Sequence, residues 1–337
     1  MINIARKNLG KKSGLSEHWL RSAQIVVTIG FMILLLNRIE WTALYSLFID
    51  LRWELVTLSI GLLIISHLMN VIRWEYMLLN LTVGRMTLLA FYGAGLLSNS
   101  FLPTGMGGDG VRAALLSQRV SPRWAILSVA LDRSTGLVAL SALLTIGLWT
   151  GPPPGLIFVS DELFTRLAPC VTVLFVLVLG IATVSLAIGW RKANSLLVKL
   201  QHRVYDLIEN WSVKFSTGDW LRLFTGGYIL SVISHMCIVM ANWVMLQAIG
   251  IQVPVSAALW LVLAITLSLL FPIAINGLGV REATYVMLLT IYGVAHEPAV
   301  MAALLSRFTL TFFGFAGGII WLLASRSPDL LMASESH

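Results

Sequence analysis

The chain has 337 residues, of which 58% are hydrophobic and only 12% are charged. Soluble domains carry roughly 25% charged residues, so this composition excludes an ordinary soluble protein and indicates an integral membrane protein. The net charge of +7 does not call for a nucleic acid partner. The basic residues fall in loops, where the positive-inside rule places them, so no nucleic acid binding is expected.

Long apolar windows predict an all-α polytopic membrane protein. Several of them exceed the roughly 18 residues that a spanning helix needs, and none shows the alternation of a barrel strand. About six full spans are expected, at 22–37, 55–79, 124–149, 168–190, 223–249 and 299–324. Two further apolar segments, 86–102 and 256–275, lead into glycine-rich motifs. Hydropathy alone leaves open whether these two are re-entrant or full spans.

Loop charges predict the topology. The N-terminal stretch and segment 191–222 are the most basic parts of the chain and are expected in the cytoplasm, whereas the acidic loop 150–167 is expected outside. Six full spans then place both termini in the cytoplasm, in the cytoplasmic (inner) membrane. Within 191–222, the spacing of apolar residues in 195–215 predicts an amphipathic helix on the inner membrane face.

The string Pro-x4-Gly-x-Gly-Val-Arg occurs twice, from Pro103 to Arg112 and from Pro272 to Arg281. Both copies have the same offset, since 272 − 103 = 169 and 281 − 112 = 169. A broken helix among lipid-facing residues leaves backbone groups unsatisfied unless protein or water covers them. The repeated string is therefore the best pointer to a functional centre.

The repeat extends beyond the glycine motifs. Ile65-Ser66-His67 recurs as Ile233-Ser234-His235 at an offset of 168, and Arg133 matches Arg307 at an offset of 174. We interpret residues 55–145 as repeat one and 223–320 as repeat two within a single integral membrane domain, 1–337.

Counting spans predicts that the two copies are inverted. Repeat one then starts outside the cell and repeat two starts inside. This topology requires 86–118 and 256–293 to be re-entrant helical hairpins that enter from opposite faces. Inverted repeats with broken helices near the midplane are a recurring plan of secondary transporters.

The glycine motifs carry the candidate binding residues. A returning half-helix that begins near Asp109 would present backbone N–H groups and a positive dipole end to an anion. Charged residues deep within the following spans usually pair or face a polar cavity. The candidate substrate-binding residues are Asn99, Pro103, Gly107, Gly108, Asp109, Arg112, Asp132, Arg133, Pro272, Asn276, Gly277, Gly279, Arg281, Glu282 and Arg307.

Two interpretations of this charged set stay open. In one, the arginines form a closed structural network with the carboxylates, or the glycines merely let helices cross closely. In the other, the surplus of positive charge and backbone donors binds a phosphate, for which arginine has suitable geometry. His67 and His235, at matching positions, are candidates for a proton relay or for hydrogen bonds between helices.

Other chemistries lack a signal in the sequence. Cys170 and Cys237 are far apart, and no cysteine or histidine pair has the spacing of a zinc site, so neither a disulfide framework nor a metal or other cofactor is expected. No Gly-x4-Gly-Lys-[Ser/Thr] string occurs, so ATP is not expected to drive the protein directly. Coupling to protons or ions would use Asp109, Asp132 or Glu282.

At these residues the chain resembles the flippase-like transmembrane family of the lysylphosphatidylglycerol synthases. The resemblance rests on three motifs in order: Asn99, Pro103, Gly107, Gly108, Asp109 and Arg112; then Asp132-Arg133; then Pro272, Gly277, Gly279, Val280, Arg281 and Glu282. It covers nearly the whole chain and implies movement of a lipid between leaflets of the membrane. Only about a dozen residues follow the last predicted span, so the synthase domain is not expected here, and the lipid could equally be a polyprenyl phosphate, another phospholipid or a glycolipid.

The leading hypothesis is a non-enzymatic flippase for an anionic, phosphate-bearing lipid or lipid-linked precursor. One alternative is an intramembrane transferase that acts on a lipid-linked sugar, with Asp109 or Glu282 as base. Another is a membrane scaffold that binds lipid or glycan biosynthetic enzymes through 195–215.

Overall fold

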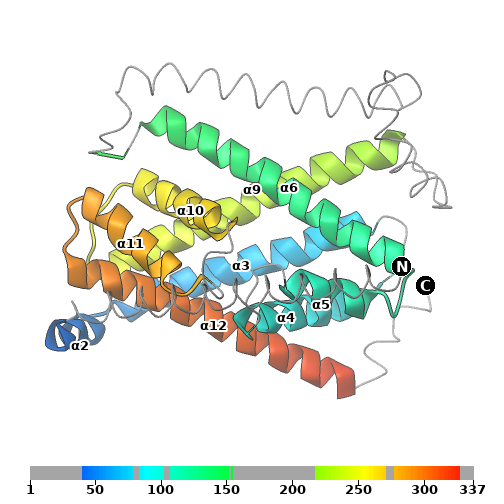
Figure 1. The fold of residues 1–337 in the computed structure, drawn as a ribbon, viewed down its shortest axis with the longest axis horizontal. Coiled ribbons are helices and arrows are strands. Elements are labelled where there is room, and N and C mark those ends of the chain that lie inside the picture. The colour runs from blue at the N-terminus through cyan, green and yellow to red at the C-terminus, as the bar shows by residue number, and fades with distance from the viewer. Residues whose placement is uncertain are drawn as a thin grey trace, which may run out of the picture.

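The computed structural model describes residues 40–78, 83–101, 107–151, 153–154, 217–270 and 277–326. Within these ranges the protein is all-helical, with nine helices and no strand (Figure 1). The helices are α2 (Trp41–Ile49), α3 (Trp53–Met77), α4 (Arg85–Phe101), α5 (Gly107–Leu116), α6 (Pro122–Thr150), α9 (Thr217–Ala248), α10 (Val255–Leu270), α11 (Val280–Ile291) and α12 (His296–Arg326).

Four helices are long and apolar enough to cross a membrane: α3, α6, α12 and residues Thr225–Ala248 of α9. They correspond to four of the predicted spans. The predicted spans 22–37 and 168–190 and the predicted amphipathic helix 195–215 lie outside the described residues. Of the predicted cytoplasmic segment 191–222, only 217–222 is described, and it forms the first turns of α9. The short helix α2 was not predicted.

Local sequence signals explain where α6 begins and ends. Ser121 is its N-cap, and the Ser121 hydroxyl accepts a hydrogen bond from the backbone N–H of Trp124 at 3.4 Å. Pro122 follows at the first helical position, where its missing N–H costs nothing. Gly151 ends the helix at φ +94°, a conformation that favours glycine.

Each glycine motif joins two helices that pack against each other. Helix α5 packs on α4 and α11 packs on α10. In the first pair, Gly95 and Gly108 bring the two backbones so close that a Cβ on Gly108 would clash with the Gly95 carbonyl. Small residues allow this close approach of membrane helices. The Asn99 Oδ1 atom accepts a hydrogen bond from the Gly108 N–H at 2.8 Å and fastens the start of α5 to α4.

Helices α3 and α9, which begin the two predicted repeats, pack along each other (Figure 1). The hydroxyls of Ser66 and Ser234 share a hydrogen bond of 2.8 Å at the contact. These two serines are matching positions of the repeat, 168 residues apart. Asn70 adds a second link, because its Oδ1 atom accepts a hydrogen bond from Ser234 at 3.2 Å.

The packing of α4 on α12 depends on glycines. Gly93 and Gly317 touch backbone to backbone, and Gly314 and Gly318 receive the side chains of Ser100 and Leu97. The matching contact of the other repeat, α10 on α6, is built differently. By the repeat offsets of 169 and 174, Gly93 matches Val262 and Gly317 matches Leu143, and these two lie in one buried apolar cluster.

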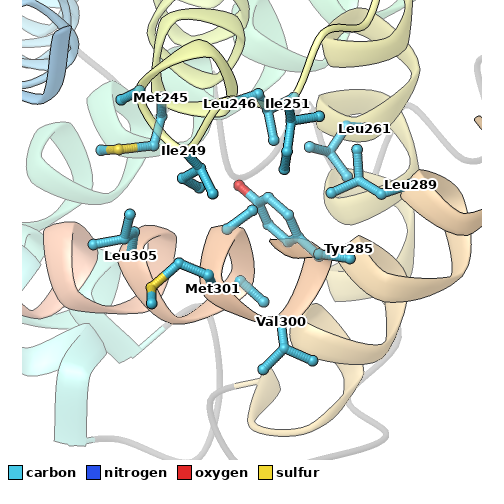
Figure 2. Close-up of a cluster of buried hydrophobic side chains, with 14 of the residues drawn as sticks. Met245, Leu246, Ile249, Ile251, Leu261, Tyr285, Leu289, Val300, Met301 and Leu305 are labelled. Carbon is cyan, nitrogen blue, oxygen red and sulfur yellow. The ribbon is translucent and has the colours of Figure 1, made fainter. Parts of the chain in front are cut away.

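Among the described residues, the largest buried apolar cluster gathers residues of α2, α3, α9, α10, α11 and α12. Tyr285 lies at its centre among aliphatic and methionine side chains (Figure 2). Its ring is only 2% exposed, and its hydroxyl donates a hydrogen bond to Asn242 Oδ1 on α9. Large apolar side chains such as Ile126, Phe308 and Leu323 remain more than 60% exposed, as expected of a lipid-facing surface.

We predict that Gly93→Ala destabilises the protein. A Cβ at this position would clash with the Gly317 carbonyl, and relieving such overpacking costs about 1–3 kcal/mol. Thermal unfolding in detergent measures the effect. Gly61→Ala is the matched control, because no atom lies within 4 Å of a Cβ built there. Equal melting temperatures for the two variants would contradict the prediction.

Candidate functional site

Arg112, in the middle of α5, is enclosed on all sides that the structure describes. Both of its terminal nitrogens donate to Asp132 Oδ2 at 3.2 Å, and one lies 3.5 Å from Asp109 Oδ1. Its guanidinium carbon lies 4.1 Å from the ring centroid of Trp74 and 5.1 Å from that of Tyr92. Arginine is stabilised by aromatic faces as well as by carboxylates, so this residue, only 5% exposed, has both kinds of partner in its burial site.

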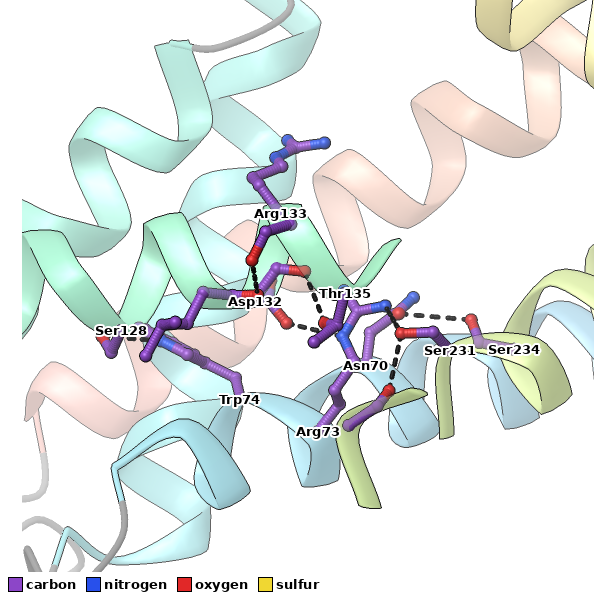
Figure 3. Close-up of polar contacts among 12 residues, drawn as sticks. Asn70, Arg73, Trp74, Ser128, Asp132, Arg133, Thr135, Ser231 and Ser234 are labelled. Atoms are coloured by element: carbon purple, nitrogen blue, oxygen red, sulfur yellow. Dashed lines mark hydrogen bonds and ion pairs between the residues drawn. The ribbon is translucent and has the colours of Figure 1, made fainter. Parts of the chain in front are cut away.

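Asp132 also binds a second arginine. Arg73, from the C-terminal half of α3, donates through Nε to Asp132 Oδ1 at 2.6 Å and through a terminal nitrogen to the Ser231 hydroxyl at 2.9 Å. Figure 3 shows Arg73 reaching between Asp132 on α6 and Ser231 on α9. A single buried carboxylate thus connects α3, α5 and α6, and Arg73 extends the network to α9.

Asp109 pairs with the arginine that follows Asp132 in sequence. Arg133 Nε donates to Asp109 Oδ2, while the Arg133 side chain is 55% exposed and points away from Asp132 (Figure 3). From its position deep in a predicted span, Arg133 is expected to pair or to face a polar cavity. It pairs, and of the three arginines in this first cluster it is the one whose side chain is accessible.

The second cluster surrounds Glu282 in the first turn of α11. Its Oε1 atom accepts from Arg307 Nε at 2.7 Å, and its Oε2 atom accepts from the Gly279 N–H at 2.8 Å. The second contact is the glutamate half of a capping box, so Glu282 also fixes the start of α11. Arg307 donates to the Gly277 carbonyl at 3.2 Å as well. Both oxygens of Glu282 therefore already have partners.

Arg281 has no carboxylate within the described part of the chain. One terminal nitrogen donates to the Ser306 hydroxyl at 2.9 Å. Its Nε atom is buried and has no hydrogen-bond partner among the described residues, which is also true of Arg112 Nε. The two motif arginines thus differ in what their terminal nitrogens meet: Arg112 meets carboxylates and Arg281 meets a hydroxyl.

The short helices α5 and α11 also begin at different positions of the motif. Helix α5 begins at Gly107, before the string's Gly-x-Gly, whereas α11 begins at Val280, the position that matches Val111. The corresponding turn of the second copy is not α-helical, and Gly277 and Gly279 adopt φ values of +63° and +82°. Only glycine reaches such values readily. Pro103, Pro272 and Asn276 lie outside the described residues.

The two histidines make different contacts. His67 Nδ1 shares a hydrogen bond of 3.0 Å with the Tyr92 hydroxyl, which links α3 to α4. His235 Nδ1 lies 2.7 Å from the Ser231 carbonyl of its own helix, so this nitrogen carries the proton. The expected bond between helices therefore forms at His67 and not at His235. Among the described residues no group of His, Cys, Asp and Glu could hold a metal ion.

Five residues that complete the site were not predicted from the sequence: Arg73, Trp74, Tyr92, Ser231 and Ser306. Arg73 could have been found as a charge inside a predicted apolar span. Ser306 could have been found by comparing equivalent repeat positions that hold different residues. It lies directly before Arg307, as Asp132 lies directly before Arg133. The aromatic residues carry no such signal, because only helix packing places their rings against Arg112.

We predict that Asp132→Asn is strongly destabilising. It leaves Arg73 without a carboxylate in the described site and Arg112 with only the longer Asp109 contact, and breaking a buried ion pair costs about 3–5 kcal/mol. Glu75→Gln is the control, because the Glu75–Arg85 pair is largely exposed and such pairs contribute about 0–1 kcal/mol. Unfolding in detergent should separate the two variants clearly. If Asp132→Asn and Glu75→Gln have the same melting temperature, the buried ion pairs of Asp132 do not hold these helices together.

Comparison with known families agrees with this architecture. No curated protein matched the chain in a sequence search. The model of the family described as "Lysylphosphatidylglycerol synthase TM region" matches residues 21–318, which include all the described residues of both clusters. The matched region is the membrane domain, and no synthase domain is matched. The chain therefore belongs to this family of multi-pass membrane proteins, which is related to lipid modification or transport.

Proposed function

We propose that this protein is a flippase that moves an anionic, phosphate-bearing lipid or lipid-linked precursor across the cytoplasmic membrane. The lipid would leave unchanged, so the protein would act as a transporter and not as an enzyme. The observation that carries the proposal is an excess of arginine at the two glycine motifs. The described clusters contain five arginines, Arg73, Arg112, Arg133, Arg281 and Arg307, against three carboxylates, Asp109, Asp132 and Glu282.

This excess of two positive charges lies inside a membrane protein, where unpaired charges are costly. A lipid phosphate supplies the missing negative charge together with several hydrogen-bond acceptors. Arginine binds phosphate well, because its planar group donates in a fixed fork. The excess therefore supports phosphate binding over a closed structural network.

The arrangement of helices supports transport. Each cluster lies where a short helix that carries the Val-Arg end of a glycine motif, α5 or α11, packs on a long helix, α6 or α12. We propose that the pairs α4–α5 and α10–α11 are re-entrant hairpins of two inverted repeats, with the lipid phosphate bound near their breaks. The exposed Arg133 and its partner Asp109 would then be the part of the first cluster that the headgroup reaches.

The carboxylates are also the candidates for energy coupling. Asp109 and Glu282 each hold an arginine of the next long helix, through the pairs Asp109–Arg133 and Glu282–Arg307. A phosphate that displaces one of these carboxylates from its arginine would leave the acid free to take a proton or ion. Transport without such coupling would run down the lipid gradient.

We predict that reconstituted protein moves fluorescent phosphatidylglycerol between leaflets at least ten-fold faster than empty liposomes, and faster than fluorescent phosphatidylcholine. Arg112→Ala/Arg281→Ala should reduce the rate to that of empty liposomes, because it removes both motif cations. A dithionite-quenching assay in proteoliposomes measures these rates.

Arg326→Ala is the matched control, since this arginine is exposed at the last turn of α12, away from both motifs. It should move lipid at the wild-type rate. Equal slow rates for wild type and the double variant with a panel of anionic lipids would disprove the flippase proposal. A covalently altered lipid in mass spectrometry would favour the transferase instead.

A further inference from the structure

The two motif arginines occupy matching positions but different electrostatic surroundings. Asp132 lies one residue before Arg133, and Ser306 lies one residue before Arg307, at the same repeat offset of 174. Arg112 therefore meets a carboxylate where Arg281 meets a hydroxyl, at 3.2 Å and 2.9 Å respectively. The repeat has exchanged a charged partner for a neutral one at this position.

The remaining acid positions do not restore the missing charge. Asp109 lies three residues before Arg112, and the matching residue before Arg281 is Leu278. Glu282 is the acid of the second motif, but its two oxygens are bound to Arg307 Nε and to the Gly279 N–H. Of the five arginines in the two clusters, Arg281 is the one without an ion pair in the described structure.

We infer that the phosphate subsite lies at Arg281 and Ser306, and that Ser306 is the residue that keeps it open to a ligand. This inference rests on the proposed function and assigns the anion to the second motif, while Arg112 serves to hold α5 in place. Ser306 accepts a hydrogen bond from Arg281 and can donate its own proton to a phosphate oxygen. An aspartate here would neutralise Arg281 and repel the phosphate.

The backbone near Arg281 supports this assignment. The turn that is helical in the first motif is unwound in the second, with Gly277 and Gly279 in the left-handed region. This turn of the second motif carries Leu278 and no acidic side chain, whereas in the first motif Asp109 occupies the additional helical turn. The first copy thus has the acidic side chains of Asp109 and Asp132 near its motif arginine. The matching positions of the second copy hold Leu278 and Ser306, which are neutral.

The test compares Ser306→Asp with Ser306→Asn, which have the same shape and differ in charge. Binding of phosphatidylglycerol in nanodiscs or detergent should be at least ten-fold weaker for the Asp variant than for the Asn variant. Arg281→Gln should lose at least ten-fold relative to wild type, and Arg326→Gln should bind as wild type does. Arg281→Gln also keeps the inference testable if neither Ser306 variant folds.

A second readout separates charge from bulk. Ser306→Asp gives Arg281 the partner that Arg112 has, so without ligand it should melt no lower than Ser306→Asn. Equal affinities for the Asp and Asn variants, or a lower melting temperature for Asp, would overturn the inference.

Two further arms identify the ligand source and separate this inference from the flippase proposal. Glycerol phosphate, tested as a free ligand, distinguishes a soluble phosphate from a lipid headgroup. If the protein binds glycerol phosphate but does not bind phosphatidylglycerol, the subsite belongs to a soluble anion. If wild type shows no preference for phosphatidylglycerol over phosphatidylcholine and moves neither, the flippase proposal fails. If wild type moves phosphatidylglycerol and Ser306→Asp does so equally fast, only the assignment to Arg281 and Ser306 fails.

Discussion

The buried carboxylate of Asp132 is the constraint on which the first half of the site depends. It accepts from Arg73 at 2.6 Å and from Arg112 at 3.2 Å, and these arginines come from two different helices. Removing such groups from water costs several kcal/mol per ion, so the arginines stay buried only while the carboxylate is in place. The consequence is mechanical as well as electrostatic: α5 is held against α3 and α6, and Asn99 holds its first turn to α4.

Among the residues that the structure describes, the second half of the site has no equivalent of this constraint. Ser306 gives Arg281 a single neutral hydrogen bond, and the start of α11 depends on the cap from Glu282 to Gly279. A charged group that arrived at Arg281 would do for α11 what Asp132 does for α5, because it would bind the half-helix to its neighbour through an ion pair. Ligand binding and the fixing of α11 to its neighbour would then be one event, which is how a binding energy can be used to change a conformation.

The four described spans and most of the charged residues of the site could be predicted from the sequence, because apolar length and a repeated motif are local signals. The sequence did not predict Arg73 as part of the site, since its partner Asp132 is 59 residues away and only helix packing brings the two together. In the repeat, Arg73 matches Ala241, so a search for matching residues passes over it. The different starts of α5 and α11 could not be predicted either. The same Gly-x-Gly-Val-Arg string is helical in one copy and unwound at its glycines in the other, and the surrounding contacts decide between the two.

The helix crossings show the same inequality between the copies. At α4–α12, Gly93 and Gly317 let the backbones touch, whereas Val262 and Leu143 occupy the matching positions at α10–α6. Side chains of that size prevent the second crossing from closing as tightly as the first, whatever the conformation. The inequality is therefore built into the residues and is not only a property of one state. Helices α4 and α5 are fixed at both their glycine contact and their ion pairs. If the protein transports a lipid as proposed, movement should therefore be concentrated in α10 and α11, the pair that carries Arg281, which has no ion pair among the described residues.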